Sequence, residues 1–290
     1  MKISVGNPVE GEDFFDREQE QARAWRKLAG SHLLMLAPRR IGKTSLILRL
    51  CATARQHGRY AVHCSFAKCE NESDCIRELF KALATEHTIE QRRKALFDKI
   101  KSVKLGALGI DWHEARPESW REAGEELGKA LADGGDDWLV CVDELPVFII
   151  NLLQQGDDGR RRARAFLYWL RDLRQTHYRR IKWLLAGSIG LDTLAARLGL
   201  SDTINDLEPF PLDAFSEESA LRFLGELARS YAIDLDEGLR AVIVRRVGWP
   251  VPYYLQLMFE HLREECVESG RTPDAAMVER VFEKLLGMGY

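Results

Sequence analysis

The stretch LLMLAPRRIGKTSLILRL, residues 33–50, decides the fold of this 290-residue chain. The apolar run over residues 32–36 predicts a buried strand, and the apolar spacing further on predicts a helix over residues 44–57. A short charged turn separates the two elements. A strand that passes through a tight turn into a helix is the setting of the phosphate-binding pattern G-x-x-x-x-G-K-[ST], and the stretch fits this pattern with one departure.

The chemistry of such a loop depends on backbone N–H groups at a helix N-terminus, where the helix dipole also favours anions. Lys43 can reach the terminal phosphates, and the Thr44 hydroxyl can bind Mg²⁺. Ala37 takes the place of the first glycine, and alanine costs little there unless the backbone needs a positive φ. We therefore predict phosphate binding by Pro38, Arg39, Arg40, Ile41, Gly42, Lys43, Thr44 and Ser45.

Two arginines in the middle of this loop, Arg39 and Arg40, add positive charge to it. They either contact a phosphate, a neighbouring subunit or a partner domain, or they are solvated and pair with nearby carboxylates. The sequence does not decide between these interpretations.

A second stretch, WLVCVDELPVF (residues 138–148), places Asp143 and Glu144 at the end of an apolar strand. Phosphoryl transfer needs a carboxylate near Mg²⁺ and a group that orients or activates water. We expect Asp143 to hold Mg²⁺ together with Thr44, Glu144 to act on the water, and Lys43 to neutralise phosphate charge. The alternative is a strand that simply ends in an exposed acidic turn.

A third stretch, LLAGSIGL (residues 184–191), places Ser188 at the end of another apolar strand. Ligand groups gather at the carboxyl ends of parallel strands, so Ser188 is a candidate catalytic residue that senses the terminal phosphate. A serine that caps the next turn is the competing interpretation.

The rest of the chain alternates strand and helix patterns as far as residue 211 and is helical beyond it. This order predicts an α/β fold in which helices cover both faces of a parallel sheet, over residues 1–212, followed by a helical lid over residues 213–290. Ser216 has the position of an N-cap. Further strands are expected at 59–66, 138–144 and 181–188, a hairpin or extended insertion at 103–112, and helices at 73–102, 117–133, 160–175, 235–247, 251–269 and 273–288.

These motifs together resemble the STAND class of P-loop ATPases, within the AAA+ group, and more narrowly the archaeal-type ATPase family. GNPVEGEDFFDREQE (residues 6–20) is similar to the family's hhGRExE segment, although Asp16 replaces its glycine. RRVGWPVPYYLQLM (residues 245–258) is similar to the GxP motif of the helical lid, with Gly248 and Pro250 in place. Family members usually continue into a winged-helix or other helical domain, and we expect such a domain beyond residue 290.

The resemblance implies that ATP or ADP, with Mg²⁺, is clamped between the sheet domain and the lid. Phe15 and Arg17 would line the base, and Pro250 would reach the base or the sugar. Asp16 makes the base contact on that side an open point. Without the resemblance, the segment around Pro250 reads as an ordinary loop before a helix, because proline is favoured at the first helical position.

Composition limits the other function classes. The net charge is −3, which gives no general attraction to nucleic acid or to anionic membranes. No apolar run has the length of a signal peptide or of a membrane-spanning helix, so we expect a cytoplasmic chain. Three of the six cysteines lie in HCSFAKCENESDC (residues 63–75), but their spacing fits no common zinc pattern, and we read them as reduced.

Two further interpretations stay open beside a nucleotide-dependent switch that hydrolyses ATP slowly. One is a DNA-associated ATPase related to origin-recognition initiators, with the arginines between residues 160 and 180 as the binding face; nucleic acid is not the favoured partner. The other is a scaffold that keeps ADP without turnover. A homo-oligomer or a protein partner also remains open, and slow hydrolysis is expected because no arginine finger is evident within the chain.

Overall fold

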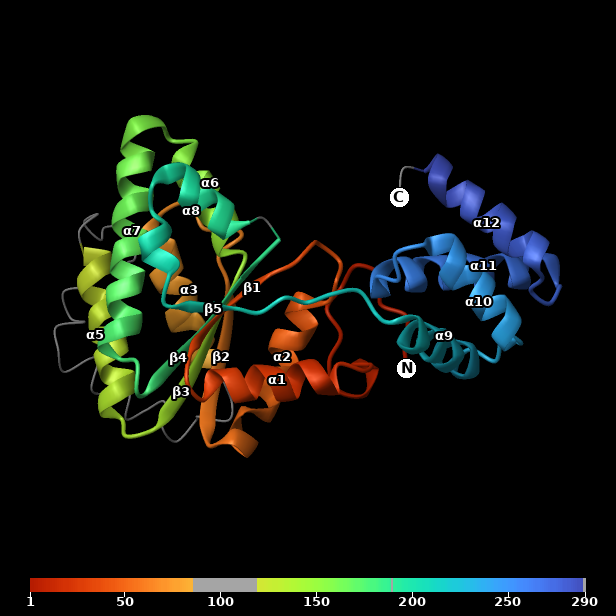
Figure 1. The fold of residues 1–290 in the computed structure, drawn as a ribbon, viewed down its shortest axis with the longest axis horizontal. Helices are drawn as coiled ribbons and strands as arrows, with labels where there is room; N and C mark the ends of the chain where they lie inside the picture. The colour runs from red at the N-terminus through yellow and green to blue at the C-terminus, as the bar shows by residue number, and fades with distance from the viewer. Residues whose placement is uncertain (86–118, 189, 289–290) are drawn as a thin grey trace. The chain divides into compact units, whose positions relative to one another are not determined.

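The sheet is parallel throughout. The structure, a computed structural model, describes residues 1–85, 119–188 and 190–288. Its five strands lie in the order β2-β3-β4-β1-β5 (Figure 1). They are β1 (His32–Leu36), β2 (Arg59–Ser65), β3 (Asp137–Asp143), β4 (Ile181–Gly187) and β5 (Leu207–Pro209). The predicted α/β fold, with a parallel sheet, flanking helices and a helical C-terminal region, is confirmed.

The register of the sheet brings three carboxyl ends to one edge. Leu33 pairs with Leu184, and Val140 pairs with Trp183, so β1, β4 and β3 run side by side in the same direction. The expected strands agree with β1 to β4 to within a residue at each end. β5 was not predicted, because it has three residues and includes a proline, which is tolerated at a sheet edge.

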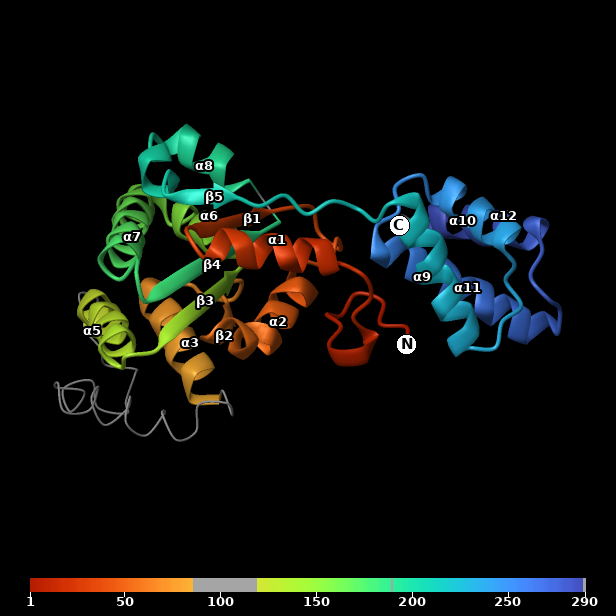
Figure 2. The ribbon, with the colours of Figure 1, turned by 60° about the horizontal axis from the view of Figure 1, so that its bottom comes forward.

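Helices flank the sheet on both sides. They are α1 (Glu18–Leu28), α2 (Lys43–Thr53), α3 (Glu72–Thr85), α5 (Ser119–Asp133), α6 (Leu145–Leu153), α7 (Gly156–Thr176) and α8 (Leu191–Leu198). Figure 2 shows α5 and α7 on one side of the sheet and α1 on the other. The first of these faces is a continuous core in which Val62, Val140 and Trp183 are buried against Phe166 and Trp169 of α7.

Some element boundaries differ from the expectation. The helix expected over residues 44–57 is α2 followed by the 3-10 turn η2 (Ala54–His57), which Gly58 ends in a left-handed conformation. α6 was not predicted, because the sequence LPVFIINLL is apolar on every face and shows no helical period. The expected hairpin at 103–112, and the end of the helix expected at 73–102, lie outside the described residues.

The chain divides into two compact units. One unit contains residues 1–18, 38–49 and 212–290, and the other contains residues 19–37 and 50–211. The sheet belongs to the second unit. The turn after β1 and the first residues of α2 belong to the first unit, together with the N-terminal segment and the C-terminal helices.

Four C-terminal helices pack around a core of their own: α9 (Glu217–Ser230), α10 (Glu237–Val247), α11 (Pro252–Ser269) and α12 (Ala275–Gly287). Phe223 and Phe259 are buried in this core. The predicted N-cap is confirmed, since the Ser216 hydroxyl accepts a hydrogen bond from the Ser219 N–H at 3.1 Å. In the described part of the chain, no helix is long and apolar enough to cross a membrane.

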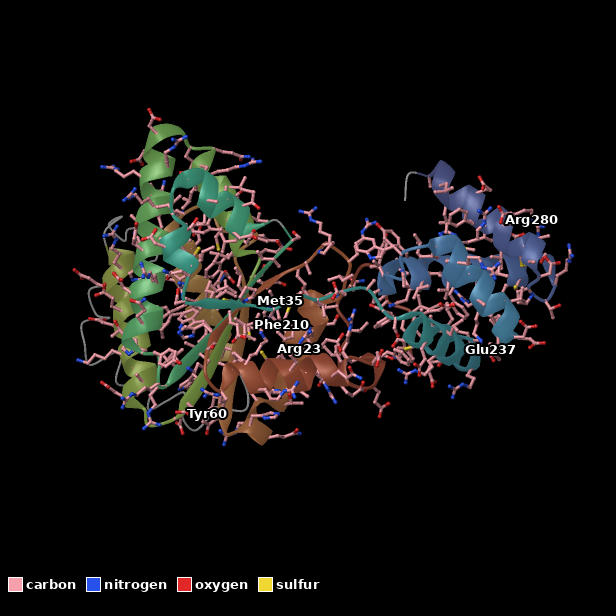
Figure 3. The ribbon with its side chains drawn as sticks, viewed as in Figure 1. Arg23, Met35, Tyr60, Phe210, Glu237 and Arg280 are labelled. Atoms are coloured by element: carbon pink, nitrogen blue, oxygen red, sulfur yellow. The ribbon has the colours of Figure 1, made fainter. Side chains whose placement is uncertain are left out.

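The end of β5 is fixed by α1. The Arg23 guanidinium lies over the Phe210 ring, 4.6 Å from its centroid, and donates a hydrogen bond to the Pro211 carbonyl at 2.8 Å (Figure 3). The Phe210 N–H donates to the Leu34 carbonyl at 2.9 Å, which extends the pairing of β5 with β1 by one bond. The chain therefore leaves the sheet at a defined point before the C-terminal helices begin.

Candidate functional site

The turn after β1 contains two residues with a positive φ directly before a helix. Gly42 has a φ of 98° and Arg40 a φ of 70°, and α2 begins at Lys43 directly after them. Only glycine takes up a φ near 98° at little cost, which explains the residue at position 42. Ala37 does not have a positive φ. The condition under which alanine would be costly at this position is therefore not met.

Lys43 lies along the loop. Its Nζ atom donates a hydrogen bond to the Pro38 carbonyl at 2.9 Å, and the residue is buried. This bond closes the turn from Pro38 to Lys43. Ile41 is buried, while Pro38, Arg39 and Arg40 are exposed. Ile41 and Lys43 are thus buried, while the two arginines of the loop are exposed to solvent.

The N-terminal segment is tied to this loop. The Val9 N–H donates to the Ser45 hydroxyl at 3.1 Å. Arg17 is buried, and its guanidinium donates to the Asp213 carbonyl at 2.7 Å and to the Ile41 carbonyl at 3.5 Å. The predicted residues Arg17 and Ser45 therefore both connect the segment to its neighbours.

Phe215 connects the three residues that were expected near the base. The centroid of its ring lies 6.0 Å from the centroid of the Phe15 ring. The same centroid lies 4.8 Å from the guanidinium carbon of Arg17. Its N–H donates to the Pro250 carbonyl at 3.1 Å. Phe15 and Arg17 thus both pack their side chains against Phe215. Phe215 was not predicted, because in the sequence it is only an aromatic residue before a helix.

Asp16 has a backbone conformation that favours glycine. Its φ is 60°, in the left-handed region that aspartate tolerates better than most residues. Its carboxylate lies 3.3 Å from the Arg222 guanidinium. Burial acts to raise the pKa of Asp16, but the hydrogen bond with Ser219 and the charge of Arg222 outweigh it and lower that pKa. Aspartate is therefore accommodated at position 16.

A second group of predicted residues meets at the carboxyl edge of the sheet. The Glu144 carboxylate accepts two hydrogen bonds from Ser188, one from its N–H at 3.2 Å and one from its hydroxyl at 3.0 Å. Asp143 is buried, and its Oδ1 atom accepts the Glu144 N–H at 2.9 Å. Glu144 itself has a φ of 55°. This conformation turns the chain sharply from β3 into α6 and directs the Glu144 side chain towards the end of β4.

Gly187 makes this arrangement sterically possible. A Cβ atom at Gly187 would lie 2.4 Å from Cδ of Pro146, far inside contact distance. The last residue of β4 therefore lies against the first turn of α6. Neither Gly187 nor Pro146 was predicted as a supporting residue, because their contact joins segments that are far apart in the sequence.

Within the described residues there is no group of three or more His, Cys, Asp or Glu side chains arranged to hold a metal ion. Mg²⁺ is usually bound in nucleotide sites by one or two protein oxygens, together with phosphates and waters. Thr44 and Asp143, which were predicted to hold Mg²⁺, each carry a side-chain oxygen, and they belong to different compact units.

The arginine-rich helix α7 is largely neutralised. Of the eight arginines between residues 160 and 180, five pair with carboxylates: Arg161, Arg162, Arg171, Arg174 and Arg180. Arg174 is buried and donates to both oxygens of Asp206, each at 2.7–2.8 Å. Near the end of α10, Arg246 pairs with Glu279 and Arg245 is exposed.

The cysteines of residues 63–75 are buried as free thiols. Cys64, Cys69 and Cys75 all lie in the core beside β2 and α3. Burial raises the pKa of the Cys64 and Cys75 thiols well above the usual value. Thiols in this state are poor metal ligands and poor nucleophiles, because the thiolate is the reactive form.

Comparison with known proteins gives structural matches alone. No family model matches the chain, and no curated protein matches it. The Walker-type ATPase paby2304 of Pyrococcus abyssi is similar over 99% of this chain and 77% of its own, with 20% identity and a TM-score of 0.67. The ORC2 protein of Aeropyrum pernix, solved as ADPNP-ADP complexes, is similar over 94% of this chain and 70% of its own, with 13% identity and a TM-score of 0.64.

A third similar structure is the ORC1 protein of Aeropyrum pernix in complex with DNA. It is similar over 95% of this chain and 66% of its own, with 15% identity and a TM-score of 0.57. At these identities the similarity establishes a shared fold. This chain therefore has the P-loop α/β fold with a helical C-terminal region.

Proposed function

We propose that this chain binds ATP or ADP with Mg²⁺ in the loop of residues 37–45, hydrolyses ATP slowly, and acts as a nucleotide-dependent switch. The observation that carries the proposal is the conformation of this loop. It follows β1, contains Gly42 with a φ of 98°, and ends at the N-terminus of α2 with Lys43 and Thr44. The dipole of α2 and the backbone N–H groups at a helix N-terminus favour an anion there.

The residues have the following roles in this proposal. Lys43 neutralises phosphate charge, and Thr44 and Asp143 hold Mg²⁺, which stabilises the charge of the phosphates when it is bound. Glu144 orients the attacking water, and Ser188 both holds Glu144 and senses the terminal phosphate. The backbone at Phe15 and Arg17, together with Pro250, borders the base. Adenine is preferred because of the resemblance to the archaeal-type ATPase family of the STAND class.

Slow turnover is supported by the contacts of Glu144. Its Oε2 atom accepts both hydrogen bonds from Ser188, at 3.0 and 3.2 Å. A carboxylate engaged in two hydrogen bonds has less freedom to accept a proton from water.

Free thiols at all six cysteines are consistent with the cytoplasm as the compartment.

The test is nucleotide binding by the purified protein and by two lysine variants. Lys43→Ala is expected to weaken Mg-ATP binding at least tenfold, because a hydrogen bond to a charged group contributes about 1.5–3 kcal/mol. Lys284→Ala removes an exposed lysine of α12 and is the matched control. Isothermal titration calorimetry gives the affinities, and the nucleotide released on denaturation shows whether the protein carries ADP. Equal affinities for Lys43→Ala and wild type would rule out the site.

A DNA-associated ATPase is the second candidate, favoured by the shared fold with an ORC1 protein solved in complex with DNA. The pairing of five arginines on and beside α7 opposes it for that face. Fluorescence anisotropy with a labelled duplex would decide, since binding through phosphates weakens steeply between about 50 and 200 mM salt. No binding at the lower salt concentration would exclude this candidate.

A further inference from the structure

Arg40 has an unusual place in the phosphate loop. It is exposed, its φ is 70°, and its guanidinium carbon lies 4.0 Å from the centroid of the Tyr253 ring. Among the described residues, no carboxylate forms an ion pair with Arg40. The charge of Arg40 is therefore balanced only by the face of an aromatic ring and by solvent.

Tyr253 is held in place from two sides. It lies in the first turn of α11, and its ring packs edge-on against Tyr254 at 5.3 Å. A Cβ atom at Gly6 would come within 3.8 Å of the Tyr253 ring, so the N-terminal segment also lies close to this ring. The Ser4 N–H donates to the Gln256 side chain at 2.7 Å, which fixes the same segment to the same turn of α11. Tyr253 is thus a fixed surface on the C-terminal helices, and Arg40 is the loop residue that lies on it.

Magnitudes decide what happens to this contact when an anion enters the loop. An exposed cation–π contact changes an equilibrium by about two- to five-fold. A charge-assisted hydrogen bond between a guanidinium and a phosphate changes an equilibrium constant by more than tenfold. A bidentate pair of such bonds changes it further. A phosphate oxygen within reach of Arg40 therefore competes successfully with the Tyr253 ring.

We propose that Arg40 leaves Tyr253 for a phosphate of the bound nucleotide, and that Tyr253 thereby sets nucleotide affinity and couples the loop to the first turn of α11. This inference rests on the proposed nucleotide site. Without ligand, the contact joins the loop to α11. With ligand, the first turn of α11 loses its partner in the loop, and the phosphate state of the nucleotide is passed to the C-terminal helices. This is a specific route for the coupling that a switch needs.

The contact must be broken on binding, so its removal strengthens binding. Tyr253→Leu, which keeps apolar bulk and removes the ring, is expected to bind Mg-ATP about two- to five-fold more tightly than wild type. Tyr253→Phe keeps the aromatic face and is expected to bind like wild type. In an Arg40→Gly background, Tyr253→Leu is expected to have no effect, because its partner is absent. Glycine suits the φ of 70° at position 40, so this background should fold.

Calorimetric titration of the wild type, the three single variants and the double variant with Mg-ATP gives this cycle of affinities. Tyr253→Leu that binds no more tightly than wild type, or that has the same effect with and without Arg40, overturns the inference. In that case wild type still binds, and the proposed function stands. If wild type itself binds no nucleotide, the proposed function and this inference both fail.

A second measurement does not depend on the folding of Tyr253→Leu. Trp249 is 48% exposed and lies four residues before Tyr253, so its fluorescence reports on the start of α11. The Trp249 signal is obtained by subtracting the spectrum of Trp249→Phe. Ligand-free Arg40→Gly is expected to give a Trp249 spectrum that differs from that of ligand-free wild type, because the first turn of α11 has lost its partner in the loop. A spectrum identical to that of ligand-free wild type would contradict the proposed release.

Discussion

Single residues in unusual backbone conformations lie at the candidate site. Asp16, Arg17, Arg40 and Glu144 all have a positive φ, and each belongs to a predicted motif. Such conformations cost roughly 1–3 kcal/mol each and persist only where surrounding contacts hold them. At Glu144 the holding contacts are two hydrogen bonds from Ser188, and at Arg17 they are backbone carbonyls.

Glu144→Gln tests the role of this carboxylate. The amide has nearly the same shape but cannot accept a proton from water, so we expect ATP hydrolysis to fall about a hundredfold or more. Mg-ATP affinity should change little, because the loop residues remain. Glu268→Gln, an exposed residue of α11, is the control. Steady-state phosphate release measures the rates, and an unchanged rate for Glu144→Gln would remove the assigned role.

His32 makes stability depend on pH. The residue is buried, its Nδ1 atom accepts the Trp183 N–H at 3.1 Å, and its Nε2 atom lies 3.3 Å from the Arg174 carbonyl. Burial, with the nearby charge of Arg174, lowers the pKa of His32 to about 4. The unfolded chain takes up a proton below pH 6.5 and the folded chain does not, so stability is lost as pH falls from 6.5 to 4.

The loss should reach about 3 kcal/mol at pH 4, at 1.36 kcal/mol for each unit of pKa difference. Urea unfolding between pH 7 and pH 4 measures it. His32→Gln is expected to be less stable at pH 7 and to show a shallower fall with pH. Parallel curves for the two proteins would show that other groups cause the pH dependence.

Elements pack through glycines at close approaches. A Cβ atom at Gly159, in the first turns of α7, would lie 1.8 Å from the Leu152 carbonyl oxygen of α6. A Cβ atom at Gly124 of α5 would lie 2.2 Å from the Trp169 ring of α7. The Leu152 carbonyl is part of the backbone, whereas the Trp169 ring is a side chain that can shift. A side chain is therefore harder to accommodate at Gly159 than at Gly124.

Gly159→Ala is therefore expected to destabilise the sheet unit by about 3 kcal/mol or more, since overpacking alone costs about 1–3 kcal/mol and here the backbone must move. Gly287→Ala, at the end of α12, adds a Cβ atom with nothing within 4 Å and is the control. Thermal unfolding of the two variants gives the comparison. A melting temperature of Gly159→Ala equal to wild type would contradict the packing of α6 on α7.

At the scale of the whole molecule, the candidate site residues are divided between two compact units. The loop of residues 38–49 is in one unit with the N-terminal segment and the C-terminal helices, while Asp143, Glu144 and Ser188 are in the other. The chain passes between the units several times, for example where β1 runs into the loop. A ligand that binds the loop tightly is therefore expected to stabilise the folded chain.

Mg-ATP at a concentration one hundred times its dissociation constant should stabilise the protein by about 2.7 kcal/mol. Differential scanning calorimetry with increasing nucleotide measures the rise in melting temperature. In Lys43→Ala the same concentrations should give a much smaller rise. An equal rise in both proteins would mean that the nucleotide binds elsewhere.

The sequence by itself determined the α/β fold, the parallel strands β1 to β4, the helical C-terminal region and the loop motif, because apolar periodicity and a glycine at Gly42 are local signals. Only the tertiary structure decided that Ser188 holds Glu144, that Arg174 is buried on Asp206, and that Arg40 lies on Tyr253. Each of these pairs joins residues far apart along the chain, and a side chain's partner depends on packing and not on sequence spacing. β5 and α6 were not predicted for a related reason. β5 is a short strand at the edge of the sheet, and α6 is apolar on every face, so neither shows a periodic pattern of apolar residues in the sequence.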